Sequence, residues 1–129
     1  MFLFFYNVLL YLLSPFILLV MLYRVLIGKE DKLRYFEKFG FSNKKRIVKR
    51  KVIWFHACSV GEVKSIFNLT KEFSKEKYSI LITTNTLLSS IYVKKNFSSK
   101  VIHQFLPLDF KFSTMKFLEH WKPDIGIFI

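Results

Sequence analysis

Cysteine is almost absent from this chain, which has one, Cys58, among 129 residues. An internal disulfide is therefore impossible, and a metal cluster built from several thiolates is excluded as well. With no disulfide to form, a reducing compartment is the simpler expectation. We expect Cys58 to act as a small apolar filler.

The glycine-rich loops of common nucleotide-binding enzymes are also missing. The chain has four glycines and contains neither GxxxxGK[ST] nor GxGxxG. An ordinary NTPase or dinucleotide enzyme is therefore not supported. His103 and His120 have no partner at the spacing of metal ligands, so the sequence predicts neither a metal site nor a bound cofactor.

Acidic residues are scarce, with 9 Asp and Glu against 21 Lys and Arg, while 52% of all residues are hydrophobic. A net charge of +12 suits nucleic acid, an anionic membrane surface or a phosphorylated substrate. The chain shows no recognisable nucleic-acid-binding module, and its start is strongly apolar. We therefore expect a membrane partner and no nucleic acid.

Charge is entirely missing from Met1 to Tyr23. A helix of this length is about 34 Å long, enough to cross a bilayer. We predict an anchor helix over residues 1–27, bent near Pro15, with Ser14 satisfying a backbone group locally. A cleaved signal peptide is not favoured, because the segment has no basic residue before the apolar run and no small-residue cleavage site. A buried core helix is not favoured either, because such a helix would show a polar face.

Positive charge follows this segment at once. The cationic residues of the predicted basic juxtamembrane segment, 28–51, are Lys29, Lys32, Arg34, Lys38, Lys44, Lys45, Arg46, Lys49, Arg50 and Lys51. By the positive-inside rule, the part after the anchor lies in the cytoplasm. We interpret the cluster as a surface for anionic lipid head groups, although a merely solvated basic face would have the same composition.

Residues 52–129 alternate between short apolar runs and stretches with helical spacing. Strands are predicted at 52–55, 78–83, 101–105 and 124–129, and helices over 63–73, 86–96 and 112–121. This alternation predicts an α/β fold with a Rossmann-like parallel sheet and right-handed crossovers. A fourth strand with nothing after it would leave a sheet edge uncovered, so we expect an incomplete lobe, the front portion of a longer protein.

Three polar loops follow predicted strands and should face one cleft at the carboxyl ends of the sheet. They are 56–62, 84–86 and 106–109. Asp109 could cap the next helix or hold a ligand hydroxyl, and capping is favoured. The hydroxyls of Thr83 to Thr86 could contact a sugar, but such residues mostly cap helices.

The first loop, HACSVGE, holds the main candidate, Glu62. Gly61 permits a tight turn, and Glu62 falls in the first turn of the next helix with Ser59 as its cap. Two interpretations stay open on physical grounds: Glu62 is a helix-end charge, or it is a general base at the mouth of a cleft. His56 could act as a base, but a packed, hydrogen-bonded histidine is the commoner case.

Five blocks in order give this chain a resemblance to the Kdo (3-deoxy-D-manno-octulosonic acid) transferases. They are GKEDKLRYFEKFG (28–40), VIWFHACSVGE (52–62), ITTNT (82–86), FLPLDF (105–110) and FLEHWKPDIGIFI (117–129). The most specific is W-x-H-x-x-S-V-G-E. One departure is Leu88-Ser89, where the family tends to have Thr-Gly.

The resemblance implies a glycosyltransferase of the GT-B type, anchored in the bacterial inner membrane and active on its cytoplasmic face. It implies CMP-Kdo as donor, a lipid A precursor as acceptor, inversion at the anomeric carbon and no metal. The family's catalytic base corresponds to Glu62, and we place Ser59 and Gly61 beside the substrate.

The resemblance covers the acceptor lobe only, 52–129, behind the anchor. A further acidic residue of the family, and the whole lobe that binds CMP-Kdo, would follow Ile129. A separately encoded C-terminal lobe is therefore a possible partner. The alternative to an enzyme is a truncated, non-catalytic module that is anchored in the membrane and binds phosphorylated lipid.

Overall fold

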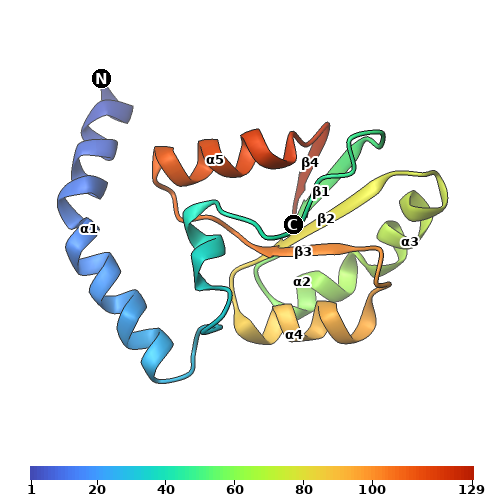
Figure 1. Cartoon of the computed structure of the whole chain (residues 1–129), viewed down its shortest axis with the longest axis horizontal. Helices are drawn as coiled ribbons and strands as arrows, with labels where there is room; N and C mark the ends of the chain where they lie inside the picture. Colours follow the sequence, from blue (N-terminus) through green and yellow to red (C-terminus); the bar gives the residue numbers. More distant parts are fainter.

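The computed structural model describes all residues, 1–129 (Figure 1). Five α-helices, one 3-10 helix and four strands follow one another along the chain. They are α1 (Phe2–Leu26), η1 (Tyr35–Phe39), β1 (Val52–His56), α2 (Val60–Ser65), α3 (Phe67–Lys75), β2 (Ser79–Thr84), α4 (Leu87–Asn96), β3 (Ile102–Phe105), α5 (Lys111–Trp121) and β4 (Ile125–Phe128).

The four strands form one parallel sheet in the order β3-β2-β1-β4. In the register, Trp54 of β1 lies between Leu81 of β2 and Gly126 of β4. The chain leaves β1 toward β3 and then returns to the other side of β1, so the order reverses beside β1. This confirms the predicted α/β fold with a Rossmann-like parallel sheet.

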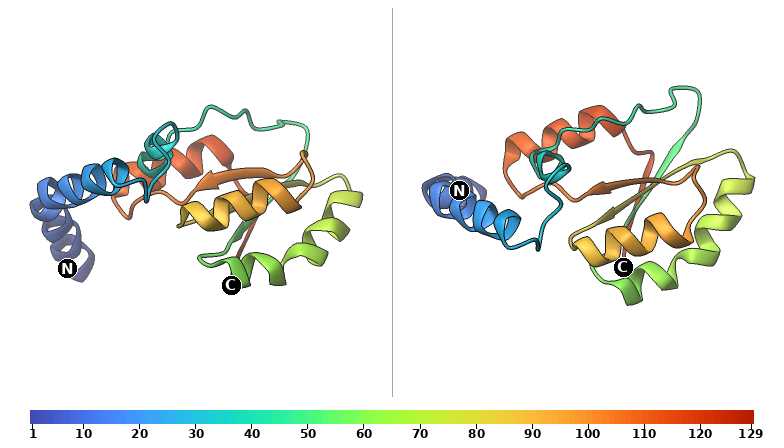
Figure 2. Two further views of the ribbon diagram at one scale, coloured as in Figure 1. Left: turned by 90° about the horizontal axis from the view of Figure 1, so that it is seen from below. Right: turned by 60° about the horizontal axis from the view of Figure 1, so that its bottom comes forward.

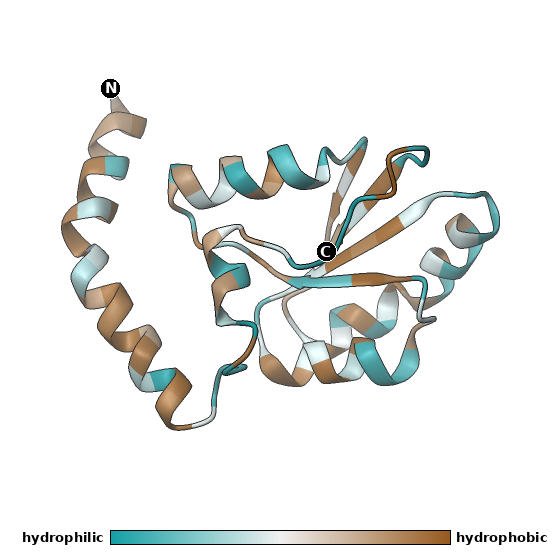
Figure 3. Cartoon of the chain, in the orientation of Figure 1, coloured by the Kyte–Doolittle hydropathy of each residue, from teal (hydrophilic) through white to brown (hydrophobic).

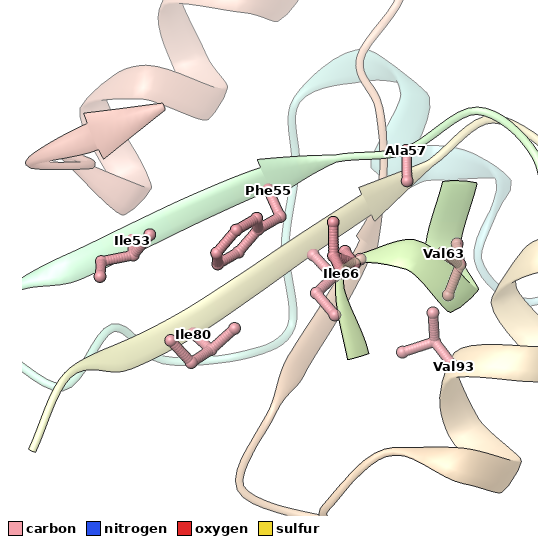
Figure 4. Packing of buried hydrophobic residues seen from close by; sticks show 8 residues of the cluster. Ile53, Phe55, Ala57, Val63, Ile66, Ile80 and Val93 are labelled. Atoms are coloured by element: carbon pink, nitrogen blue, oxygen red, sulfur yellow. The ribbon is translucent and has the colours of Figure 1, made fainter. Parts of the chain in front are cut away.

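Helices cover both faces of the sheet (Figure 1). Alternate side chains of β1 and β2 pack with α2 and α4 in a cluster of eight buried residues: Ile53, Phe55, Ala57, Val63, Ile66, Ile80, Ile82 and Val93 (Figure 4). On the other face, Val52 and Leu81 pack against Phe117 and Trp121 of α5. Because both faces of the sheet are covered, every residue of β2 is buried, and the centre of the strand, Ile80 to Ile82, shows no polar alternation.

The predicted helix over 63–73 is two helices in the structure. The helical hydrogen bonding is interrupted at Ile66, between α2 and α3. Ile66 is 2% exposed and belongs to the larger core cluster. The prediction that Val63 and Ile66 lie on the buried side of a helical stretch is therefore confirmed. The break between the two helices could not be predicted, because the sequence has no proline or glycine there.

Helix α1 is long and apolar enough to span a membrane, and its most apolar 18-residue window is not buried against the protein (Figure 3). It bends between its two halves (Figure 2). Pro15 has no N–H for the carbonyl of Tyr11, and Ser14 Oγ donates to that carbonyl at 2.7 Å instead. Both the bend and the role of Ser14 are therefore confirmed.

The segment after α1 folds along the edge strand β3, which the sequence did not indicate. Arg34 Nη2 and Lys44 Nζ both donate to the carbonyl of His103, at 3.0 and 2.6 Å. Glu37 Oε2 accepts from the backbone N–H of Phe105 at 2.8 Å. These side chains pair with backbone groups that an edge strand would otherwise expose.

Four of the ten cations in 28–51 are thus bound within the protein. Besides Arg34 and Lys44, Lys38 pairs with Glu30 at 2.7 Å and Arg46 donates to the carbonyl of Trp121 at 2.7 Å. The other six side chains make no hydrogen bond or ion pair: Lys29, Lys32, Lys45, Lys49, Arg50 and Lys51. The division of the chain at residues 27 and 51 stays a prediction.

Candidate functional site

The turn between β1 and α2 is built by a reciprocal pair of hydrogen bonds. Ser59 Oγ accepts from the backbone N–H of Glu62 at 3.2 Å, and the Glu62 carboxylate accepts from the backbone N–H of Ser59 at 3.4 Å. This is a capping box, which satisfies N–H groups that have no partner inside the helix. The prediction that Ser59 caps the helix and Glu62 lies in its first turn is confirmed.

The Glu62 carboxylate is held through one of its two oxygens. Oε2 accepts the Ser59 N–H and a shorter bond, 2.6 Å, from the backbone N–H of Cys58. Oε1 makes no hydrogen bond, and the side chain is half-buried. The Cys58 N–H, followed by the Ser59 groups, lowers the pKa of the Glu62 carboxyl below its usual value. The site therefore presents an ionised, oriented carboxylate with a free oxygen.

Gly61 lies inside α2 and is exposed. A Cβ built there would meet only Ser59 Oγ, at 3.8 Å. Gly61 therefore permits the turn, as expected, but the turn does not require a glycine at this position. Because Gly61 has no side chain, the space next to Ser59 is open to a ligand.

The side chains of His56, at the end of β1, and Cys58 lie next to each other. His56 Nε2 is 3.2 Å from Cys58 Sγ, and His56 Nδ1 is 3.0 Å from Thr83 Oγ1. His56 is buried, and this burial lowers its pKa. The packed, hydrogen-bonded interpretation of His56 is confirmed. Cys58 differs from expectation, because its sulfur faces polar groups.

The second loop joins the first, as predicted. Asn85 Nδ2 donates to Cys58 Sγ at 3.4 Å, and Ser89 Oγ donates to the carbonyl of Cys58 at 3.3 Å. Thr86 caps α4 by accepting from the backbone N–H of Ser89 at 3.2 Å. The capping role expected of this threonine stretch is confirmed, and Ser89, which departs from the family pattern, connects the two loops.

The third loop turns away from the Glu62 turn, so the expectation of one cleft for all three loops is wrong. Asp109 accepts from the Tyr6 hydroxyl of α1, and Leu108 N–H donates to the carbonyl of Lys38 at 2.7 Å. The loop follows the edge strand β3 and leads to α5 on the opposite face. Asp109 does not cap α5, whose first turn has no side-chain cap.

This third loop lines an apolar cavity of about 410 Å³ together with β1, β4 and α5. Trp54, Phe117 and Phe128 form much of its wall, with Trp54 and Phe128 rings 4.9 Å apart. Glu62 does not line it. No group of three or more His, Cys, Asp or Glu side chains is arranged to hold a metal ion.

Comparison with known proteins gives a consistent result. The family model described as 3-deoxy-D-manno-octulosonic-acid transferase matches residues 33–129. A protein of that name from Rickettsia bellii is 40% identical over 126 residues, which are 96% of this chain and 30% of that protein. The one from Haemophilus influenzae is 33% identical, with the same shares of 96% and 30%.

A more distant organism gives the same family. A probable mitochondrial 3-deoxy-D-manno-octulosonic acid transferase of Arabidopsis thaliana is 36% identical over 92% of this chain and 27% of its own length. The chain thus spans about a third or less of the length of these relatives. No solved structure matches it significantly. On the family match and these identities, the chain belongs to the 3-deoxy-D-manno-octulosonic acid transferases, a family of glycosyltransferases.

Proposed function

We propose that this chain is the acceptor-binding N-terminal part of a Kdo transferase that moves Kdo from CMP-Kdo to a lipid A precursor in lipopolysaccharide biosynthesis. The observation that carries the proposal is the Glu62 carboxylate, which is held through Oε2 while Oε1 is unpaired. A general base needs this combination, because it must be oriented and still have an oxygen for the incoming proton.

In the proposed reaction, Oε1 of Glu62 takes the proton from a hydroxyl of the acceptor sugar. The hydroxyl oxygen forms a bond to the anomeric carbon of Kdo, from the side opposite the phosphate. The bond between that carbon and the phosphate oxygen breaks, and CMP leaves with the electron pair. The configuration is inverted, and the proton stays on Glu62 until solvent removes it.

Ser59 and Gly61 contribute to the same site. Ser59 fixes the turn through the capping box, and the open space beside Gly61 allows the acceptor to approach the backbone. Residues for CMP-Kdo are not assigned, because the relatives extend far beyond the part that this chain matches.

The proposed location is the cytoplasmic face of the bacterial inner membrane. Helix α1 is proposed to provide one span, in which case Tyr6 separates from Asp109, the residue it contacts in the structure. The six cations without an internal partner follow the helix in the sequence. By the positive-inside rule, they keep the folded part in the cytoplasm, where anionic lipid would attract each by about 1 kcal/mol. The acceptor, a phosphorylated lipid, lies in the same membrane.

The test combines this chain with a lobe that can bind the donor. The chain is expressed in membranes with the C-terminal part of the Rickettsia bellii relative, and Kdo transfer from CMP-Kdo to lipid A precursor is measured. Glu62→Gln should lower the rate by about a hundredfold or more, since it removes the base. Glutamine at this position still completes a capping box, so the fold is retained.

The matched control is Glu72→Gln, which changes an exposed carboxylate on α3 paired with Lys75. It should leave the rate unchanged. Equal rates for wild type and Glu62→Gln would remove the catalytic role.

A non-catalytic module that binds phosphorylated lipid is the second candidate, favoured by the unpaired cations of 28–51. It predicts binding of lipid A precursor in nanodiscs without transfer under any combination of lobes. Transfer that depends on Glu62 would exclude it.

A further inference from the structure

A second hollow lies on the opposite side of β3 from the apolar cavity, at the edge of the sheet. It measures about 570 Å³ and opens between α4, the turn after it, β3 and the segment that follows α1. Ten residues line it: Arg34, Lys44, Ser90, Val93, Lys94, Phe97, Ser98, Ser99, Val101 and His103. Neither Glu62 nor any other residue of its turn is among them.

The lining carries three cations and no carboxylate. Lys44 and Lys94 come from segments far apart in the sequence and repel each other, and Arg34 repels Lys44 as well. Glu37 is the acid whose charge acts on Lys44, and it already accepts two bonds from Arg34, each 2.8 Å, and one from the backbone N–H of Phe105. Glu37 thus neutralises Arg34, whereas Lys44 and Lys94 have no carboxylate paired with them, which favours an anion between these two.

Lys94 is the cation that the fold does not use. Arg34 and Lys44 both hold the carbonyl of His103, whereas Lys94 is exposed and makes no hydrogen bond or ion pair. Ser99 is exposed as well, and its hydroxyl has no partner. An ammonium group and a hydroxyl at the rim of one hollow are donors suited to phosphate oxygens.

The floor of the hollow is fixed. Arg34 donates to His103 Nδ1 at 2.9 Å, so the proton of a neutral ring sits on Nε2, which donates to Thr84 Oγ1 at 2.9 Å. His103 therefore adds no charge and offers no free nitrogen. A ligand would meet the three cations and the rim hydroxyls, with Val93 and Phe97 beside them.

We propose that this hollow is a binding site for a phosphomonoester, separate from the Glu62 turn and formed by Arg34, Lys44 and Lys94. The doubly charged monoester matches a lining of three cations next to one paired carboxylate better than a singly charged diester does. This site does not depend on Kdo transfer, and it can exist whether or not Glu62 is a base.

The test uses the full chain in detergent micelles with uncharged head groups, followed by amide NMR. Inorganic phosphate, titrated at constant ionic strength, should shift the amides of Ser98, Ser99 and Val101 in a saturable way. Lys94→Gln should weaken this binding about tenfold, because one charge-assisted bond is lost. Arg34 and Lys44 are not substituted, since they hold β3.

The matched control is Lys95→Gln, the next residue on α4, which is also exposed but does not line the hollow. It should leave the affinity unchanged. A second experiment places the chain in nanodiscs with phosphatidic acid, a monoester, or phosphatidylglycerol, a diester. Shifts with free phosphate support a soluble ligand, and shifts only with phosphatidic acid support a lipid head group.

Three results would overturn the site. They are the absence of saturable shifts in both experiments, equal weakening by Lys94→Gln and Lys95→Gln, and equal shifts with the two lipids in the absence of a response to inorganic phosphate. The last two would show that the positive charge acts diffusely. None of them bears on the transfer reaction, which has its own readout.

Discussion

The backbone N–H of Cys58 donates to Oε2 of Glu62 at 2.6 Å, which ties the carboxylate of α2 to the end of β1. The same oxygen completes the capping box with Ser59. Glu62 thus has a structural role that is visible in the fold, and the proposed catalytic role uses its other oxygen. Substitutions at this turn can separate the two roles.

Ser59→Ala should destabilise the protein by about 1 kcal/mol, because the backbone N–H of Glu62 loses its acceptor. Thermal unfolding in detergent, followed by circular dichroism, measures the change. Ser99→Ala is the control, since that exposed side chain makes no hydrogen bond. Equal stability of the two variants would mean that the cap contributes nothing.

The stabilisation from the Glu62 carboxylate should depend on pH. Its pKa is lower in the folded state than the ordinary value of 4.5, so its contribution is present above about pH 4.5 and is lost as pH falls through the folded value. The free energy of unfolding of wild type and Glu62→Gln, measured by urea denaturation, should differ most near neutral pH. A difference that does not change between pH 7 and pH 3 would contradict this.

Gly40→Ala should destabilise the protein by about 2 kcal/mol or more. Gly40 has φ +83°, and an added Cβ would lie within 2.2 Å of the carbonyl oxygen of Ser113, where α5 meets η1. Gly28→Ala is a close control, because φ is +74° but no atom lies within 4 Å, which leaves only a backbone cost of about 1 kcal/mol. Denaturant unfolding of both variants shows whether the contact with α5 matters.

His103 should stay neutral far below the usual pH for histidine. Burial, followed by the charges of Arg34 and Lys44, lowers its pKa to about 3. In the unfolded chain it binds a proton near pH 6.5, so its effect on stability is to weaken the fold as pH falls from 6.5 toward 3. Nitrogen NMR of the ring should show the Nε2–H tautomer at pH 5, and a protonated ring there would contradict the structure.

Much of the fold follows from local patterns in the sequence. Short apolar runs such as Ile80–Ile82 are typical of strands that helices cover on both faces. The absence of charge from Met1 to Tyr23 is equally a local feature, and it is typical of a helix that can cross a membrane. The position of Glu62, directly after a strand and at the start of a helix, is equally local. The sequence therefore placed the candidate base on the correct turn, although its catalytic role stays a proposal.

Other features depend on pairs of residues far apart in the chain. Arg34 and His103 are 69 positions apart, and Tyr6 and Asp109 are 103 apart. The spacing of residues within one segment cannot predict which residue of a distant segment it will contact. For this reason the sequence did not indicate that part of the basic segment covers the edge of β3, and it wrongly directed Asp109 to a helix cap.

The sequence by itself determined the α/β fold, the apolar helix and the strand-to-helix turn with Ser59 and Glu62, since each depends on neighbours within a few residues. Only the tertiary structure decided which cations stay free, which loop joins the Glu62 turn, and that Lys94 and Lys44 line the same hollow. Burial and charge at these points are produced by packing of distant segments, so they exist only once the sheet has formed.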